Sequence, residues 1–408
     1  MNPLHGPLAQ YAERLHRVAG DAHHVASPLG AWLLLALTGP AATGDTRAAL
    51  TEALGTDVDS AAVAARALLA TPHPLVAAAT ALWERAPFEE LAGWRATLPE
   101  RTQTGPLPDQ ATLDAWAREH TYGLIDRFPI GVTPDVLLIL ASALATKVSW
   151  AEPFQVAPAG QLGPGSPWAG RLKRVLRTPG HGHRCWITAS ARAGDVAVHA
   201  APAQPVAAAD GKAGMLVVSV AAAPDVPAAD VLAAAQKIAA GAATAPDGTA
   251  PGRRSLYDLP LGDTPLWTLR EETVRAFGRQ ERINAVLPCW SAESRHNLTP
   301  AGFGVAARAL GALLGLSEPP YEAVQSAVAR YGRYGFEAAA VTAFMVATGL
   351  PPEGIARVAE LRFGHPYAVV AVATDSAGGP WHGLPVYSAW VAEPAELPED
   401  ELADPPTR

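Results

Sequence analysis

Few residues in this chain have the types and spacing that chemistry requires. Candidate metal ligands gather at one place, where His181, His183 and Cys185 occupy alternate positions that would point the same way along a strand. No fourth ligand accompanies them and they follow a loop, so a structural role is favoured over a metal site. The chain also lacks the G-x-S-x-G, H-E-x-x-H and G-x-x-x-x-G-K patterns of hydrolases and nucleotide-binding proteins. The sequence therefore predicts a protein that is not an enzyme, with no catalytic residue, no metal and no cofactor.

The charge pattern argues against several classes of partner. Only 17% of the 408 residues are charged, the net charge is -8, and no run of Lys and Arg is long enough for a basic patch. We therefore expect no nucleic-acid partner. The helix predicted over residues 60–69 has Arg66 as its one basic residue, so no polyanion activator is expected. Residues 25–44 carry no charge, but Pro28, Gly30, Gly39 and Pro40 interrupt them, which favours a buried helix over a membrane span.

Both ends of the chain and its cysteines give further expectations. The start, MNPLHGPLAQYAERLHRVAG, lacks the basic-then-apolar pattern of a secretory signal, which points to the cytoplasm by sequence alone and leaves the compartment open. The two cysteines, Cys185 and Cys289, exclude a disulfide framework. Residues 395–408 are acidic and rich in proline, so we expect a solvated tail after a single domain of residues 1–394. We expect a monomer.

Hydrophobic periodicity predicts a mixed order of helices and strands. Amphipathic or capped helices are predicted over residues 8–19, from Ser27-Pro28 onward, and over 109–128, 228–239 and 300–314. Strands are predicted over residues 75–83, 136–148, 187–200, 215–220, 282–290, 324–331, 367–373 and 386–391. The regular alternation of a doubly wound fold is absent, which favours the α+β class.

One long segment, residues 325–366, admits two interpretations. It begins as a strand and continues through Gly335 into FEAAAVTAFMVAT, whose alanine content favours a helix. Alternate positions from Phe336 to Thr348 would nevertheless form one face if the segment became a strand. Local propensity alone favours the helix.

Several segments, taken in order, together resemble the serpin superfamily. They are VASPLG and its continuation to Gly55, WAREHTYGLI at residues 116–125, the strand at 136–148 with the following Trp150, the strand and helix over 282–314, and the C-terminal strands from His365 to Pro394. The helix at 116–125 resembles the one that lies across the main sheet in that family. The resemblance implies a serpin-like α+β domain with a central large β-sheet, smaller sheets, about eight or nine helices and an exposed reactive-centre loop over about residues 335–362.

The same resemblance gives residues 335–342 a function. They resemble the hinge of a reactive-centre loop, which here consists of Gly335, Phe336, Glu337, Ala338, Ala339, Ala340, Val341 and Thr342. In that family a serine (or cysteine) protease cuts the loop, the hinge inserts into the central sheet as a new strand, and the protease stays attached as a distorted acyl-enzyme. Small hinge residues suit insertion, because each side chain must fit between existing strands at native packing density. We expect such a protease partner and suicide-substrate inhibition.

Two counts place the reactive-centre bond differently within the bait residues 343–358. Counting from the hinge glycine places it near Thr348, Gly349 and Leu350. Counting back from the strand that follows places it near Ile355 and Arg357, and Arg357 would suit a trypsin-like protease. The hinge count has more weight, because the inserted length determines how far the protease is carried.

Three residues depart from the family's hinge pattern and favour an alternative, a non-inhibitory serpin-fold binding or structural protein. Phe336 stands where the first inserting residue is usually small, and overpacking typically costs ~1–3 kcal/mol. Arg333 and Tyr334 precede Gly335, where the family prefers acidic side chains.

The family also places polar residues beneath the opening of the sheet, in the regions called the shutter and the breach. This chain offers Ser27, Ser142, Gln325 and Trp150 at the corresponding positions. We expect Ser27, Ser142 and Gln325 to hydrogen-bond with one another.

Overall fold

The fold is taken from a computed structural model that describes residues 2–208, 210–245, 250, 252–275, 279–336 and 353–402. Its helices are α1 (His5–Ala19), α2 (Pro28–Thr38), α3 (Gly44–Leu54), α4 (Val58–Ala70), α5 (Ala92–Arg95), α6 (Gln110–His120), α7 (Ala228–Thr244) and α8 (Phe303–Leu313). These eight α-helices of the described chain agree with the expected number.

Twenty strands accompany the helices in the described chain. The first ten are β1 (His24–Ala26), β2 (Ala77–Glu84), β3 (Gln103–Pro106), β4 (Leu138–Ala145), β5 (Val148–Ser149), β6 (Gln155–Pro158), β7 (Arg174–Arg177), β8 (Arg184–Ser190), β9 (Gly194–Pro202) and β10 (Val206–Ala208). The others are β11 (Gly211–Ala221), β12 (Gly262–Asp263), β13 (Trp267–Arg275), β14 (Gln280–Leu287), β15 (Trp290–Asn297), β16 (Val324–Tyr331), β17 (Gly335–Phe336), β18 (Glu353–Arg362), β19 (Tyr367–Asp375) and β20 (Pro385–Val391). The α+β class predicted from the sequence is confirmed.

The largest sheet has seven antiparallel strands in the order β1-β20-β19-β11-β9-β8, with β10 beside β11. Its central strands are continuously apolar because both faces are covered. Along β11, Met215 and Val217 belong to the main core, whereas Leu216 and Val218 pack in a second core against α7. A second sheet has six strands in the order β12-β13-β18-β14-β7-β6.

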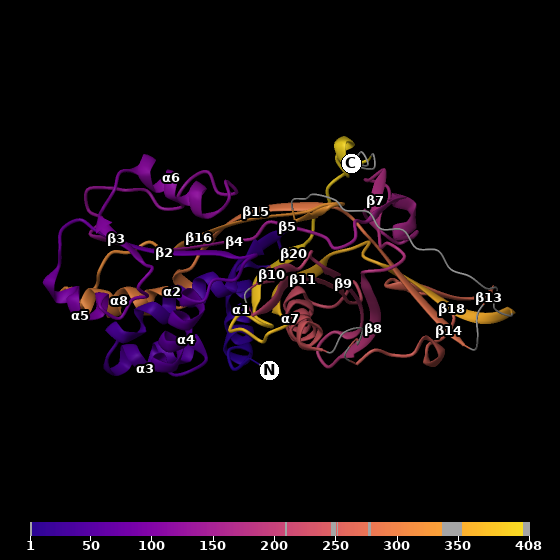
Figure 1. The fold of residues 1–408 in the computed structure, drawn as a ribbon, viewed down its shortest axis with the longest axis horizontal. Coiled ribbons are helices and arrows are strands. Elements are labelled where there is room, and N and C mark those ends of the chain that lie inside the picture. Colours follow the sequence, from indigo (N-terminus) through magenta and orange to yellow (C-terminus); the bar gives the residue numbers. More distant parts are fainter. Residues whose placement is uncertain are drawn as a thin grey trace.

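Three smaller sheets are β3-β2-β4, β15-β16 and β17-β5. In Figure 1 the strands β2, β4, β15 and β16 run along the upper part of the molecule, with α6 above them and α2, α3, α4 and α8 below. The helix α6 packs Leu113 and Trp116 onto Ala81 of β2 and Ala141 of β4. The helix predicted over residues 109–128 is therefore present over residues 110–120 and packs on β2 and β4.

Local capping explains where the helices below this sheet begin. Ser27 is the N-cap of α2 and accepts a hydrogen bond from the amide of Gly30 at 3.2 Å, and Pro28 takes the first helical position. All residues of α2 except Leu34 are buried, as its uncharged sequence predicts. Among the described residues, no helix combines the length and the apolar character needed to cross a bilayer.

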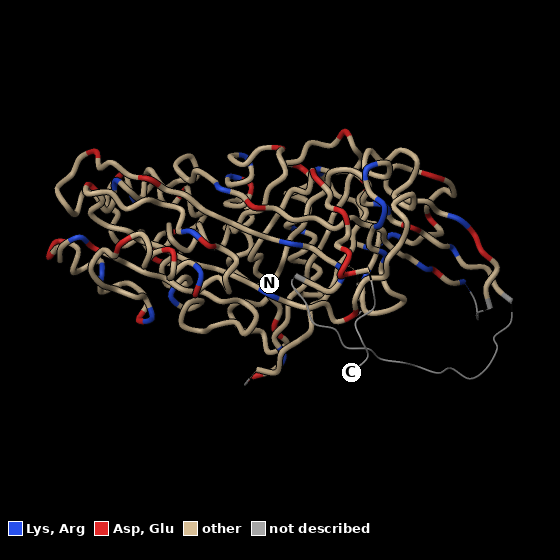
Figure 2. Tube along the Cα trace, turned by 90° about the horizontal axis from the view of Figure 1, so that it is seen from above, with Lys and Arg blue, Asp and Glu red and all other residues tan. Residues whose placement is uncertain are grey.

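Charged residues of both signs are interspersed along the described chain (Figure 2). Ion pairs on the second sheet are typical, with Arg270 beside Glu272 at 2.7 Å and Arg357 beside Glu271 at 3.1 Å. The chain in Figure 2 thus offers no long stretch of a single sign among its described residues.

The strand β18 corrects the expected extent of the loop. Residues 353–362 were predicted as the end of a reactive-centre loop over 335–362, but they pair antiparallel with β13 and in parallel with β14. Ala356, Val358 and Leu361 are buried there. Because both neighbours lie far away in the sequence, local patterns could not reveal this pairing. Residues 337–352, which include the rest of the hinge and precede β18, lie outside the described part.

The C-terminal tail also differs from the solvated end expected for residues 395–408. The amide of Ala395 donates to the carbonyl oxygen of Cys289 at 2.7 Å, and Leu397 is buried. The Glu396 carboxylate accepts the amides of Lys173 at 2.7 Å and Arg174 at 3.1 Å. Residues 395–402 therefore pack on the domain, and 403–408 lie outside the described part.

Two segments predicted as single strands each divide into two strands instead. Residues 187–200 divide into β8 and β9, which turn before Gly194, and residues 282–290 divide between β14 and β15. Gly194 has a φ of 65°, which a glycine adopts without strain. The turn between β8 and β9 contains SARAG at residues 190–194, which the prediction of one continuous strand overlooked.

Candidate functional site

The central sheet expected from the sequence is divided into two parts. One part is β3-β2-β4 and the other is β15-β16, and β4 and β16 are not paired with each other in the described chain. Each therefore ends its part with a free backbone edge, which is a template for pairing with a further strand. We call the space between β4 and β16 the seam.

Cavities lie along the seam. One of about 90 Å³ is lined by Ser142 of β4, Gln325 of β16 and Trp116 of α6. Another of about 270 Å³ is lined by Thr146, which follows β4, and by Ala329 of β16. The described strands thus leave room between them, and much of the lining consists of small side chains.

The predicted shutter residues Ser27, Ser142 and Gln325 line the same cavity at the seam. The amide group of Gln325 bonds twice to the backbone of Ser27, accepting its N–H and donating to its carbonyl oxygen, both at 2.8 Å. The Ser142 hydroxyl instead donates to the carbonyl oxygen of Gly30 at 3.2 Å. The expected mutual bonding of all three side chains is therefore wrong, because Ser142 bonds to α2 and Gln325 reaches the Ser27 backbone.

The start of the hinge follows β16 and pairs with β5, which follows β4. Gly335 pairs with Ser149 and Phe336 with Val148, so that β17 runs antiparallel to β5. The amide of Gly332 donates to the carbonyl oxygen of Gly335 at 3.2 Å and reverses the chain after β16. We call residues 332–335 the hinge turn. The other hinge residues, Glu337, Ala338, Ala339, Ala340, Val341 and Thr342, lie outside the described residues.

The segment after β5 holds the hinge turn through its carbonyl groups. The backbone amide of Trp150 donates to Tyr334 at 3.0 Å, and its indole Nε1 donates to Gly332 at 3.0 Å. The amide of Phe154 donates to Arg333 at 3.0 Å. Trp150, the residue assigned to the breach from the sequence, is buried, and the contact from Phe154 was missed because nothing local marks it.

Close approach explains the glycine at the end of the hinge turn. A Cβ at position 335 would overlap the carbonyl oxygen of Val148 and would lie 2.8 Å from the Cα of Ser149. Any larger residue at 335 would therefore separate β17 from β5.

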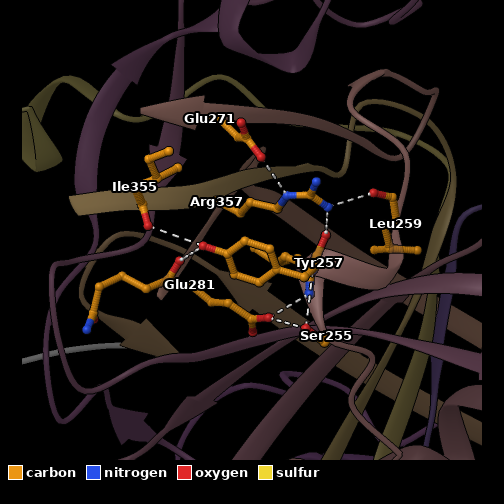
Figure 3. A network of polar contacts seen from close by, with 9 residues as sticks. Ser255, Tyr257, Leu259, Glu271, Glu281, Ile355 and Arg357 are labelled. Atoms are coloured by element: carbon orange, nitrogen blue, oxygen red, sulfur yellow. Dashed lines mark hydrogen bonds and ion pairs between the residues drawn. The ribbon is translucent and has the colours of Figure 1, made fainter. Parts of the chain in front are cut away.

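Arg357 is a structural residue of β18 (Figure 3). Its guanidinium donates to the carbonyl oxygens of Leu256 at 2.8 Å and Leu259 at 3.0 Å and pairs with Glu271. It also lies 4.8 Å from the ring centroid of Tyr257. A side chain with these partners is not free to enter a protease pocket.

Ile355 belongs to the same network, because its carbonyl oxygen accepts the Tyr257 hydroxyl at 3.2 Å (Figure 3). Its backbone is thus fixed in β18, although its side chain is 54% exposed. The structure therefore disagrees with a reactive-centre bond at Ile355 or Arg357. The other candidates, Thr348, Gly349 and Leu350, lie outside the described residues.

The histidines considered as metal ligands serve packing. His183 bonds to His199 at 3.0 Å and to the carbonyl oxygen of Glu152 at 2.8 Å, so both of its ring nitrogens are engaged. His181 lies 3.5 Å from the Glu152 carboxylate on the surface. Burial raises the pKa of the Cys185 thiol to about 12, which keeps it protonated. No group of three or more His, Cys, Asp or Glu in the described chain could hold a metal.

Three buried side chains, hydrogen-bonded in series, have the spacing of a catalytic triad. The Ser388 hydroxyl lies 2.6 Å from His16, and His16 lies 2.8 Å from His24. All three residues are buried, and Ser388 is only 1% exposed. A substrate cannot reach this hydroxyl, so the arrangement supports the core and not catalysis.

Comparisons with known proteins give a consistent result. No protein-family model and no curated protein sequence matches this chain. Solved structures do. The structure of the thermophilic serpin tengpin in its native state is 13% identical to this chain in sequence, with a TM-score of 0.63. The match covers 95% of this chain and 94% of the tengpin chain.

Two further structures are similar over nearly their full length. Thyroxine-binding globulin in complex with thyroxine is 14% identical with a TM-score of 0.61, and covers 96% of this chain and 99% of its own. Serpin48 from the insect Tenebrio molitor is 14% identical with a TM-score of 0.58, and covers 95% of this chain and 97% of its own. At such identities the likeness concerns the fold alone.

Proposed function

This chain has the serpin fold, and from that premise we propose that it inhibits a serine or cysteine protease as a suicide substrate. The protease nucleophile attacks a backbone carbonyl carbon in residues 343–352, near Thr348-Gly349-Leu350. An acyl bond to the protease forms, and the amine of the next residue leaves. The hinge then enters the seam before water can hydrolyse the acyl bond, and the attached protease is carried with it and distorted. In this account the chain is a bait and not a catalyst.

The observation that carries the proposal is the seam. Two free strand edges, β4 and β16, lie on either side of a space lined partly by small residues. Continuing the register of Gly335 with Ser149 and Phe336 with Val148 would bring Thr342 opposite Ser142. An inserted hinge strand would then satisfy backbone groups on both edges.

Strain supplies the driving force in this account. A divided sheet leaves backbone donors and acceptors without strand partners, and a new strand would pair them on both sides. Insertion after cleavage would release the energy stored in the uncut chain, as in other loop-insertion switches. A single domain, a protease as partner and a monomeric state belong to this proposal.

A second candidate is a non-inhibitory binding protein. Phe336 at the first inserting position favours it, because a large group there slows insertion. A groove of about 830 Å³ beside the end of α7, lined in part by Arg184, Lys212 and Asp375, could hold a small polar ligand. Thyroxine-binding globulin, whose structure contains thyroxine, shares the fold.

Incubation with a panel of serine and cysteine proteases tests the inhibitory proposal. We expect at least one protease to form a complex that survives denaturing electrophoresis, with a new N-terminus of this chain within residues 344–353. Blocking the protease nucleophile beforehand should abolish the complex. If every protease that cuts the loop leaves without a covalent complex, the inhibitory proposal is wrong and the binding protein is favoured.

Replacing Phe336 by threonine is expected to improve trapping. A smaller side chain removes an overpacking cost of ~1–3 kcal/mol from the first step of insertion, so insertion should be on the order of tenfold faster. The ratio of trapped protease to cleaved inhibitor measures this, because faster insertion outruns hydrolysis. Phe336→Tyr keeps the ring and is the matched control. An unchanged ratio in the threonine variant would show that Phe336 does not limit insertion.

A further inference from the structure

The acidic C-terminal tail contacts the hinge turn directly. The Glu401 carboxylate accepts the backbone amide of Arg333 at 2.7 Å and forms an ion pair with the Arg330 guanidinium at the end of β16. The Glu401 side chain is only 12% exposed. A charge-assisted bond to a backbone amide of the hinge turn is stronger than a neutral one.

Arg333 completes the contact from the other side. Its guanidinium donates to the carbonyl oxygens of Glu401 at 2.9 Å and Leu402 at 3.2 Å. The same group donates from Nε to the carbonyl oxygen of Phe154 at 3.0 Å. Arg333 is 7% exposed, so it joins the tail, the hinge turn and the segment after β5 in one buried cluster.

The chain brings the tail to this position already ordered. Ala395 bonds to Cys289, Leu397 is buried, and the Glu396 carboxylate binds two backbone amides before the tail reaches the hinge turn. Little further conformational entropy is therefore lost when Glu401 docks.

Gly332 leaves the space in which the carboxylate sits. A Cβ at this position would lie 2.9 Å and 3.1 Å from the two carboxylate oxygens of Glu401. Glu401 is the end of a flexible side chain, so an alanine at 332 would displace it and leave every charge in place.

We propose that the hinge turn is a binding site for the chain's own acidic segment, residues 399–402, and that this segment holds the turn against β5. The segment binds only the conformation in which residues 332–335 have their present shape. Binding therefore raises the population of molecules whose hinge has begun to pair with β5. It thereby sets how readily the hinge enters the seam, a consequence that rests on the proposed inhibitory function.

Amide hydrogen exchange of residues 331–336 in the full-length, uncut protein tests the binding step. We expect exchange on the order of tenfold faster in Glu401→Gln and in Gly332→Ala, because each loses a charged hydrogen-bond partner of the hinge turn. The matched control is Glu399→Gln, which removes the same charge from an exposed position of the tail. Equal exchange in all four proteins would overturn the proposal.

Addition of the segment in trans provides a second test. A chain that ends at Pro398 should show the same fast exchange at the hinge turn, and a synthetic peptide of residues 398–404 should restore protection. The same peptide with Gln in place of Glu401 should not restore it. A peptide that leaves exchange unchanged in the folded truncated chain would contradict docking by this segment.

The consequence for insertion is measured separately, as the rate at which the loop-cut chain gains thermal stability. We expect this rate to fall in Glu401→Gln relative to Glu399→Gln. If exchange rises but the rate is unchanged, the tail binds the hinge turn without controlling insertion, and that part of the proposal is wrong. The exchange tests need neither a protease nor a cut loop. Their results therefore do not depend on whether the proposed inhibitory function is correct.

Discussion

Acidification to about pH 5 is expected to destabilise this protein strongly, because four histidines are enclosed in neutral form. The pKa of His16 is lowered to about 3, first by burial and then by the nearby His24 and His296. Burial likewise lowers the pKa of His24 to about 4 and of His183 to about 4. The pKa of His199 is lowered well below its ordinary value, first by burial and then by His183.

The hydrogen bonds of these rings fit the neutral form. His24 donates from Nδ1 to the carbonyl oxygen of Ala22, so its Nε2 accepts from His16 Nδ1, and His16 Nε2 accepts the Ser388 hydroxyl. A proton on His24 Nε2 would set two N–H groups against each other. Protonation of these rings in the folded state therefore breaks bonds as well as burying charge.

The direction of the effect follows from the lowered pKa values. In the unfolded chain each histidine titrates near 6.5, whereas in the folded chain it titrates well below that value. The stabilisation is fully present above about pH 6.5 and is lost as the pH falls toward the folded-state values. Each ring loses roughly 1.4 kcal/mol per pH unit in this window. Four rings together lose several kcal/mol by about pH 5, a large part of the roughly 5–15 kcal/mol of a typical domain.

Thermal unfolding between about pH 7.5 and pH 5 measures this loss. The unfolding temperature should fall steeply below about pH 6.5. In His183→Gln the fall should be shallower, because glutamine can keep both bonds of the ring and does not titrate. The matched control His181→Gln removes a histidine whose side chain is 70% exposed and should keep the wild-type slope. A flat profile in the wild type would show that the buried rings do not govern acid stability.

Much of the fold could be predicted from local sequence. The strand predicted over residues 324–331 has the same bounds in the structure, and the start of α2 at Ser27-Pro28 is confirmed. Both succeed because periodicity and capping are local effects that the tertiary environment reinforces here. The ordered set of motifs that resembles serpins gave the fold as well, and the comparisons with solved structures confirm it.

Pairing between distant segments could not be predicted. The local sequence of β18 is typical of the end of a loop, and the residues with which it pairs in β13 and β14 precede their partners by more than 70 positions. The tail reads as a solvated acidic end, because its partners Arg330 and Arg333 are recognised only once β16 ends beside it. The division of the central sheet into two parts likewise depends on which strand edges pair with each other. The apolar pattern of a single strand does not determine its pairing partner.

The departure at Arg333, before the hinge, has a structural explanation. Arg333 and Tyr334 occupy positions at which the serpin superfamily, which this sequence resembles, prefers acidic residues. Here the acidic group comes from Glu401 of the tail, and Arg333 binds it through both its backbone amide and its side chain. Arg333 is therefore weaker evidence against inhibition than the sequence suggested, whereas Tyr334 and Phe336 still favour the non-inhibitory alternative.

Cleavage of the loop tests the central claim that the seam accepts the hinge. A broad-specificity protease would cut within residues 343–352, with the site verified by N-terminal sequencing, and thermal unfolding would be compared before and after. Because insertion pairs both free edges, we expect the cut chain to unfold more than about 10 °C higher, a shift that corresponds to several kcal/mol for a chain of this size.

A variant with a blocked hinge is the control for this measurement. Ala340→Arg should be cut at the same place but gain no stability, because a long charged side chain does not fit the small space between β4 and β16. A rise in the wild type that is absent from Ala340→Arg is the result predicted here. An unfolding temperature that does not rise when the wild-type loop is cut would contradict insertion into the seam.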